Sequence, residues 1–312
     1  MIRDIIIKND PFIGSFRLVD IPKGLVQVVD DIGGIASEEF LLRLADYLDF
    51  IREDKPIDWS KKLNDAALPE FFIAWKHDKE VYGYRLHFNK DGLIASERLF
   101  LEKKNEFVLM AEFRKGLPIL HNPFWSVDYS VGNDLFNLEI PDGPYPTPLM
   151  REVEPLRTLM MELGFSKLQC PKKVDGLKFN KEHMTDEQRG WFASFLMASD
   201  FGLEKIEGVS EGDPEWKFYK GCNDKLIEFE LDTFGSGFNY LVSTLPYLQH
   251  TVINNGTFID PNFTTCLHHN LELFMWKELK VIEGGRSWQI LTRYDIRDNS
   301  KSLVKTLRLE SD

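Results

Sequence analysis

The sequence is poor in cysteine, in net positive charge and in long apolar runs, and each shortage narrows the classes of protein it can represent. Its three cysteines are odd in number and lie far apart (Cys170, Cys222 and Cys266). They argue against a disulfide framework or a cysteine-rich zinc site and favour reduced thiols in the cytoplasm. No apolar run approaches the roughly 20 residues that cross a bilayer. The opening residues, MIRDIIIKND, lack the apolar core of a signal peptide and are typical of a β-strand.

The charge balance argues against a general nucleic-acid surface. The formal net charge is −12, although a local basic patch is compatible with that total. Apolar and aromatic residues are abundant, with 43% hydrophobic residues, 24 Phe and 7 Trp in 312 residues. This composition predicts a well-packed globular protein, built as one large domain or two smaller ones.

The first two thirds of the chain are predicted to form strands, one helix, more strands and then helices. Short strands are expected at 4–8, 14–19 and 25–29, and then an amphipathic helix with Ser37 as its N-cap, running to about Phe50. Residues 70–114 alternate with period two, which predicts a four-strand antiparallel meander. Pro and Gly are dense at 116–148, which indicates a surface loop or linker, and helical patterns follow at 149–163 and 185–200.

The last third of the chain changes its pattern. After three predicted strands at 202–207, 215–221 and 225–231, helices (237–250 and 264–279) alternate with strands (256–260 and 288–292). This alternation is typical of a parallel sheet. The predicted fold class is therefore α/β with α+β elements.

The loop between the third strand and the first helix has the layout of a phosphate-binding loop. A buried strand runs into Gly33 and Gly34, then Ser37, then a helix, as in a Walker A motif, whose N–H groups, lysine and hydroxyl hold phosphates and Mg²⁺. The position before Ser37, where the lysine belongs, is Ala36. Acids bracket the loop: Asp30, Asp31, Glu38 and Glu39. A triphosphate placed there would meet carboxylates and no cation.

The loop, and several other residues that could suggest a functional site, also have a simpler structural interpretation. A glycine pair between a strand and a helix is usually a turn, and Asp260 at a strand end is most often a helix N-cap or turn residue. His268 and His269 have no partner set at metal-ligand spacing, so no metal site is predicted. Four alternating aromatic residues are expected to be core rather than a base-stacking platform: Trp75, Tyr82, Tyr84 and Phe88.

Four segments in this order resemble the ABC/SMC-type, AAA-like ATPases, in particular the OLD-like group of bacterial defence and toxin–antitoxin operons. They are IIIKNDPFIGSFRLVDIPKGLVQVVDDIGGIASEEFLLRLADYLDFI, YGYRLHFNKDGLIASERLFLEKK, LDTFGSGFNYLVSTLPYLQ, and GTFIDPNFTTCLHHNLELFMWKELK with SWQILTRYD. The resemblance implies one ABC-type P-loop NTPase-like head over residues 1–312, with an antiparallel β subdomain and a helical segment. Its parts would be 1–54, 70–115, 149–200 and 201–312.

The resemblance also implies which motifs are degenerate. The Walker A positions would be Asp30, Gly33, Gly34, Ala36 and Ser37, and the signature-like loop would be Gly235, Ser236 and Gly237. In the Walker B segment, Asp260 would take the Mg²⁺-side position and Pro261 the place of the catalytic glutamate; a one-residue shift would put Asn262 there instead. Tyr294 would stand for the switch histidine. With these losses no catalytic residue remains, and turnover is not expected.

The resulting functional hypothesis is a catalytically inactive ATPase-like protein without a cofactor. It would act in the cytoplasm as a regulatory or scaffolding subunit of a bacterial or phage-related defence or toxin–antitoxin-type complex. Its partner would be a protein: a second copy, an active ATPase, or an effector nuclease or toxin, with no fused Toprim-like nuclease after Tyr294. The alternative is an ATPase with atypical motifs, in which Ser37 and Asp260 share Mg²⁺ with ATP, possibly linked to DNA or RNA processing.

Overall fold

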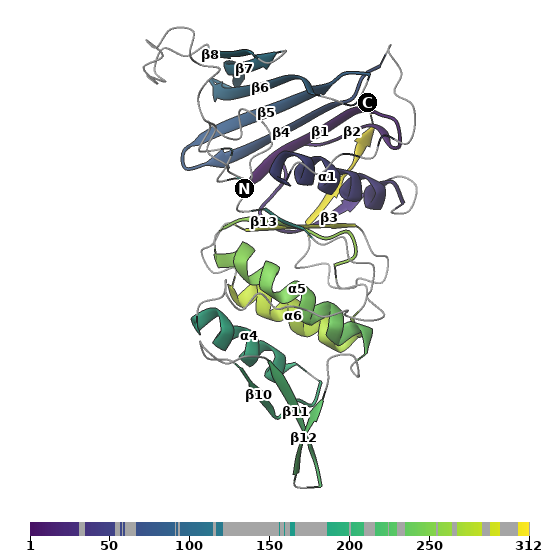
Figure 1. Ribbon diagram of the computed structural model, residues 1–312, viewed down its shortest axis with the longest axis vertical. Coiled ribbons are helices and arrows are strands. Elements are labelled where there is room, and N and C mark those ends of the chain that lie inside the picture. Colours follow the sequence, from purple (N-terminus) through teal and green to yellow (C-terminus); the bar gives the residue numbers. More distant parts are fainter. Residues whose placement is uncertain are drawn as a thin grey trace.

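The fold was analysed in a computed structural model, and it is a stack of layers that is mixed α/β and rich in strands (Figure 1). An antiparallel sheet lies at the top of the view, helix α1 lies beneath it, and a parallel sheet follows; helices and a small third sheet complete the lower end. The structure describes residues 1–30, 35–53, 57, 59, 67–90, 92, 94–114, 117–120, 156, 159, 163–165, 186–199, 201–208, 216–223, 225–229, 235–253, 255–263, 267–282, 288–293 and 305–311.

The upper sheet has eight strands in the order β16-β2-β1-β4-β5-β6-β7-β8, and each neighbouring pair is antiparallel. The meander predicted over residues 70–114 is confirmed as β4 to β7, because the period-two pattern there fixes which face is buried. The strands are β1 (Ile2–Asp10), β2 (Gly14–Leu18), β4 (Glu70–His77), β5 (Glu80–Phe88), β6 (Ile94–Lys103), β7 (Glu106–Arg114), β8 (Leu117–Leu120) and β16 (Glu310–Ser311).

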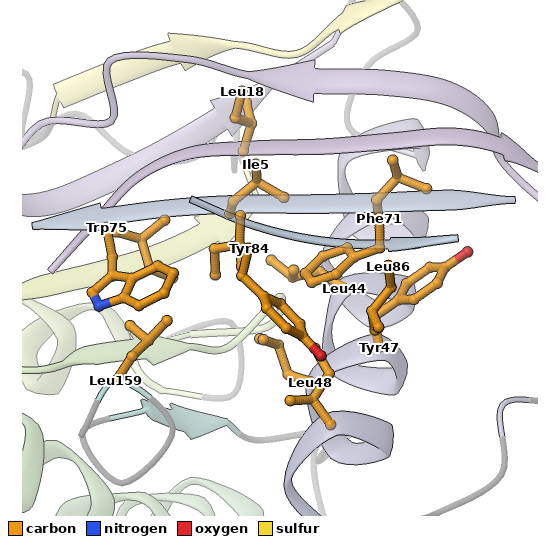
Figure 2. Close-up of a cluster of buried hydrophobic side chains, with 14 of the residues drawn as sticks. Ile5, Leu18, Leu44, Tyr47, Leu48, Phe71, Trp75, Tyr84, Leu86 and Leu159 are labelled. Carbon is orange, nitrogen blue, oxygen red and sulfur yellow. The ribbon is translucent and has the colours of Figure 1, made fainter. Parts of the chain in front are cut away.

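Helix α1 (Ile35–Glu53) packs its apolar stripe against one face of this sheet. Figure 2 shows Leu44 and Tyr47 of the helix among side chains of β1, β4 and β5. The Tyr47 and Phe71 rings are stacked with centroids 5.0 Å apart. The four aromatic residues expected in the core are all buried, so that prediction is confirmed: Trp75, Tyr82, Tyr84 and Phe88.

The second sheet is parallel, as the alternation in the last third predicts. Its order is β15-β3-β14-β13-β9. The pattern indicated three of these strands, while β9 and β15 were missed. The strands are β3 (Gly24–Val29), β9 (Leu163–Phe165), β13 (Thr257–Ile259), β14 (Gln289–Arg293) and β15 (Lys305–Arg308).

Helices α5 (Ser236–Ile253) and α6 (His269–Ile282) pack below the parallel sheet around a second apolar core. Helix α6 begins later than the predicted start at 264. The carbonyl of His268 accepts the first helical hydrogen bonds, from the N–H groups of Leu271 (2.9 Å) and Glu272 (3.0 Å), so His268 takes the N-cap position. Among the described helices, none is both long and apolar enough to cross a membrane.

A buried glutamine connects the two large sheets. Gln289 of β14 is fully buried, and its side-chain amide donates to the carbonyl oxygens of Ile2 (2.7 Å), Ile21 (3.1 Å) and Pro22 (3.1 Å). Its carbonyl oxygen accepts from the N–H of Ile2 and the hydroxyl of Thr257, both at 2.9 Å. Every polar atom of this side chain is therefore used, which makes its burial tolerable and fixes the start of β1 over β14.

The third sheet has three antiparallel strands at the lower end of Figure 1, beside helix α4 (Asp186–Ala198). The strands are β10 (Lys205–Glu207), β11 (Lys217–Cys222) and β12 (Lys225–Phe229). Phe218 of β11 is buried against Phe238 of α5, with ring centroids 5.6 Å apart and planes at 90°. This contact anchors the base of the sheet to the lower core, and the tip of the β11–β12 hairpin extends away from it.

Candidate functional site

The candidate site lies at the carboxyl edge of the parallel sheet, where neighbouring strands end together. Val28 of β3 pairs with Arg293 of β14, and Leu291 of β14 pairs with Ile259 of β13. The residues that follow β3 and β13 therefore emerge at one edge, as ligand-binding residues do in open α/β sheets. Asp260 stays hydrogen-bonded to this edge, since its N–H donates to the carbonyl of Leu291 at 3.0 Å.

The carboxylate of Asp30 lies at the first turn of α1. Oδ2 of Asp30 accepts a hydrogen bond from the backbone N–H of Ser37 at 2.6 Å, and both residues are buried. The first N–H groups of a helix lack helical partners and attract negative charge. The carboxylate of Asp30 thus takes an acceptor position that a bound phosphate would use.

The prediction of Ser37 as N-cap is wrong. The helix begins at Ile35, so Ser37 lies inside the first turn, and its N–H is a donor to be satisfied. Asp30, which follows β3, accepts the hydrogen bond from this N–H group. No local capping pattern in the sequence indicates this contact.

A cation also reaches this turn, which the sequence analysis missed. The guanidinium of Arg293, at the end of β14, pairs with the carboxylate of Glu38 in the first turn of α1. Both side chains are about a quarter to a third exposed, at 31% and 24%. Glu38 was expected to face a bound triphosphate without any nearby cation; it is instead neutralised by Arg293. The hint of this contact in the sequence was that a charged residue ends a buried apolar strand.

Asp260 is sealed inside the protein. Its side chain is fully buried, Oδ2 accepts from the hydroxyl of Tyr240 on α5 at 2.5 Å, and Oδ1 accepts from the N–H of Asn262 at 2.9 Å. The second bond closes a turn of the kind aspartate favours, which matches the simpler interpretation of this residue. Burial raises the pKa of the Asp260 carboxyl to about 7, because desolvation outweighs the two hydrogen bonds.

Pro261 follows in the same buried turn. Its carbonyl accepts from the N–H of Arg293 at 3.4 Å and from the hydroxyl of Thr292 at 3.5 Å. Neither Pro261 nor the buried amide of Asn262 offers a carboxylate for general-base chemistry.

The signature-like residues lie at the start of α5. Gly235 and Ser236 are exposed and Gly237 is half-buried. Because Tyr240, one turn later, touches Asp260, the start of this helix faces the same edge of the sheet. Gly33, Gly34 and Tyr294 lie outside the described residues. The half-buried Ala36 is in the first turn of α1 and brings no charge.

Within the part of the chain that the structure describes, no group of three or more His, Cys, Asp or Glu side chains is arranged to hold an ion. His268 is exposed at the start of α6, and its Nδ1 accepts only a long contact of 3.4 Å from the N–H of Asn270.

No protein-family model matches the sequence, and no curated protein matches it. Three of the solved structures that match align over the whole chain. The SMC head domain from Thermotoga maritima is 11% identical, with 98% of that chain covered and a TM-score of 0.49. The Smc head domain from Pyrococcus furiosus, bound to the C-terminal domain of ScpA, is 8% identical, with 96% covered and a TM-score of 0.51. The recombination mediator RecF with ATP is 12% identical, with 97% covered and a TM-score of 0.35.

The Pyrococcus furiosus structure, at 8% identity, shows a likeness of fold alone. The fold of this chain is thus similar to that of an SMC head domain, which is an ABC-type ATPase fold. This confirms the ABC/SMC-type architecture predicted from the order of the four segments. The OLD-like affiliation and the assignment of single residues to degenerate motifs stay predictions.

Proposed function

We propose that this protein is a catalytically inactive ATPase-like head that serves as a regulatory or scaffolding subunit. The observation that carries the proposal is the hydrogen bond from the N–H of Ser37 to the carboxylate of Asp30. It places an internal anion at the first turn of α1, where an ATPase of this fold would hold phosphate. A nucleotide would have to displace a buried carboxylate and then face it at close range.

The position expected to hold Mg²⁺, Asp260, is equally poorly suited to that ion. Both carboxylate oxygens of Asp260 already accept hydrogen bonds from Tyr240 and Asn262, and its raised pKa lowers its charge near neutrality. Binding Mg²⁺ would require the ionised form of a carboxyl group that is fully buried. The described residues therefore do not fit Mg²⁺-ATP.

A head domain that does not hydrolyse ATP can still act through surfaces that bind other proteins. The Pyrococcus furiosus head of similar fold is bound to a domain of ScpA, which supports a protein partner for this chain too. The family resemblance puts that partner in a defence or toxin–antitoxin-type complex in the cytoplasm. An active ATPase, an effector nuclease or a toxin fits the proposal.

The test is calorimetric titration of the purified protein with ATP and Mg²⁺, with thermal shift alongside. We expect no heat and no stabilisation. Asp30→Ala is the informative variant, because it removes the internal anion, and weak binding gained in it would support the role given to Asp30. Glu106→Ala, on an exposed strand start, is the matched control. Binding by the wild-type protein that Ser37→Ala weakens would contradict the proposal.

The alternative is an ATPase that binds nucleotide in an unusual way, and one observation favours it. Arg293 places a guanidinium beside the first turn of α1, close to where the missing lysine would act. This hypothesis requires measurable ATP hydrolysis that both Arg293→Ala and Asp260→Ala abolish. An intact protein without turnover rules it out.

A further inference from the structure

One short segment, residues 305–311, supplies an end strand to both large sheets. Its first part, β15, pairs in parallel with β3 and is the end strand of the parallel sheet on that side. After the single residue Leu309 it becomes β16, which pairs antiparallel with β2 and is an end strand of the upper sheet. In Figure 1 this yellow strand rises from the parallel sheet, past α1, to the mark C beside the upper sheet. We call residues 305–311 the clamp segment.

The clamp segment is held as an extended peptide is held on a sheet edge. Its backbone runs along β3 with Arg308 opposite Val29, and the N–H of Leu309 donates to the carbonyl of Val29 at 2.7 Å. The side chain of Leu309 is buried in the upper core, and Leu307 is half-buried against the same core. Main-chain pairing with alternate side chains in apolar pockets is a general mode of peptide recognition.

The other contacts of the clamp segment are short and open to solvent. The ion pair between Nε of Arg17 and Oε2 of Glu310, at 2.7 Å, joins side chains that are 48% and 44% exposed, so it adds little in water. β15 has four residues and β16 has two, and parallel pairing is slightly less stable per residue than antiparallel pairing. Four further side chains of the segment are exposed: Lys305, Thr306, Arg308 and Ser311. Detachment therefore costs one buried anchor and a short run of edge pairing.

We infer that the clamp segment is a detachable internal ligand whose release opens a peptide-binding edge along β3 and β2. Release leaves unpaired the backbone groups of β3 and β2 that β15 and β16 now satisfy, with the apolar pocket of Leu309 between them. Such an edge is a template for another strand. The ligand class is an extended peptide with a leucine-like side chain for this pocket, and in the free protein the chain itself supplies it. The inference holds whether or not nucleotide binds.

Release of the clamp segment also affects the candidate site. The carbonyl of Val29 would lose the N–H of Leu309, and the next residue is Asp30, which accepts from the N–H of Ser37. The end of β3 would then be paired only with β14 on its other side. The bond between Asp30 and Ser37 should therefore open more often while the segment is detached. A peptide bound along the edge should close it again.

The test is the binding of a fluorescent peptide with the sequence of residues 305–312 to full-length protein, followed by anisotropy. Leu309→Asp in the protein places a carboxylate in the apolar pocket, so the clamp segment detaches while the edge itself is unchanged. We expect this variant to bind the peptide at least about tenfold more tightly than the wild type, whose own segment competes for the edge. Thr306→Asp adds the same charge at an exposed position of the segment. It is the matched control and should bind as weakly as the wild type.

The peptide itself provides the second control. A peptide that carries Leu309→Asp should not bind the Leu309→Asp protein, because the apolar anchor is lost. Binding of this altered peptide would show that the peptide occupies a different surface. Equal affinity of the unaltered peptide for wild type and Leu309→Asp, or no binding to either, would overturn the inference.

Native-state hydrogen exchange of the wild-type protein tests detachment without any substitution. The paired amides of the clamp segment should exchange together through a local opening, while those of β4 and β5 stay protected. In Leu309→Asp, the Ser37 amide should exchange faster than in the wild type, and an unchanged rate would contradict the link to the candidate site. Clamp amides that exchange only together with β4 and β5, through global unfolding, would overturn the inference.

Discussion

The hydroxyl of Tyr240 donates a hydrogen bond to Oδ2 of Asp260 over 2.5 Å, and neither side chain is accessible to water. The bond ties the first turns of α5 to the end of β13. It also places an ionisable carboxyl where its charged form is poorly solvated. Burial raises the pKa of Asp260 from 3.8 to about 7.

This pKa predicts a specific dependence of stability on pH. Between about pH 4 and about pH 7 the folded protein holds a proton on Asp260 that the unfolded chain has released. The free energy of unfolding should therefore fall as pH rises through this window, by up to about 1.4 kcal/mol per pH unit from this group. Below and above this window, Asp260 does not make the free energy of unfolding depend on pH.

Asp260→Asn isolates this contribution, because it removes the titrating group while keeping a polar side chain. Denaturant unfolding of both proteins across the window should show the wild type losing stability relative to the variant as pH rises. Tyr240→Phe removes a bond that favours the ionised form, so the window should extend to higher pH. Parallel pH profiles for wild type and Asp260→Asn would contradict the prediction.

The internal cap of α1 is a second target. Asp30→Ala removes the acceptor for the N–H of Ser37 and should lower the free energy of unfolding by about 1–2 kcal/mol, as the loss of a helix cap does. Asp30→Asn keeps an acceptor oxygen and should cost less. Chemical denaturation measures both, and an unchanged midpoint for Asp30→Ala would show that the bond adds nothing.

A buried ion pair joins α1 to the last residue of β1. Nε of Arg43 lies 2.6 Å from Oδ2 of Asp10, which also accepts from the hydroxyl of Tyr47 at 2.8 Å. Arg43→Met leaves the carboxylate buried without its cation and should cost about 3–5 kcal/mol. Arg43→Met combined with Asp10→Asn should recover part of that loss in the same unfolding assay. A double variant less stable than Arg43→Met would refute this explanation.

Gly92 is required by the packing of Trp59. Its φ is +75°, and a Cβ there would lie 2.4 Å from Cδ1 of Trp59, whose ring packs on Phe88. Gly92→Ala should therefore destabilise the protein by about 1–3 kcal/mol. Gly190→Ala is the matched control, since a Cβ there meets nothing within 4 Å in helix α4, and it should stabilise by up to about 1 kcal/mol. The difference in melting temperature between the two variants measures the effect.

Much of the fold was predictable because it depends on local patterns. The period-two alternation of residues 70–114 fixed four strands and their buried face, including Trp75 and Tyr84. The strand and helix alternation of the last third indicated the parallel sheet. The likeness of the whole chain to an SMC head followed from the order of four segments along the sequence.

The division of strands between sheets was not predictable in this way. β1, β2 and β3 follow one another within the first 29 residues, yet β1 and β2 join the antiparallel sheet and β3 joins the parallel one. β15 and β16, near the end of the chain, pair with β3 and β2 near its beginning. Pairings between such distant segments depend on packing, which no local pattern contains.

The sequence by itself determined the layout of strand, loop and helix, an uncharged Ala36 in place of a lysine before Ser37, and the positions of the acids. Only the tertiary structure decided what those acids do. Asp30 caps the first turn of α1, Asp260 is sealed by Tyr240, and Glu38 is neutralised by Arg293, which lies 255 residues away in the chain. The physical reason is that the protonation and availability of a carboxylate depend on burial and on the donors around it. Those donors come from elements that only folding brings together.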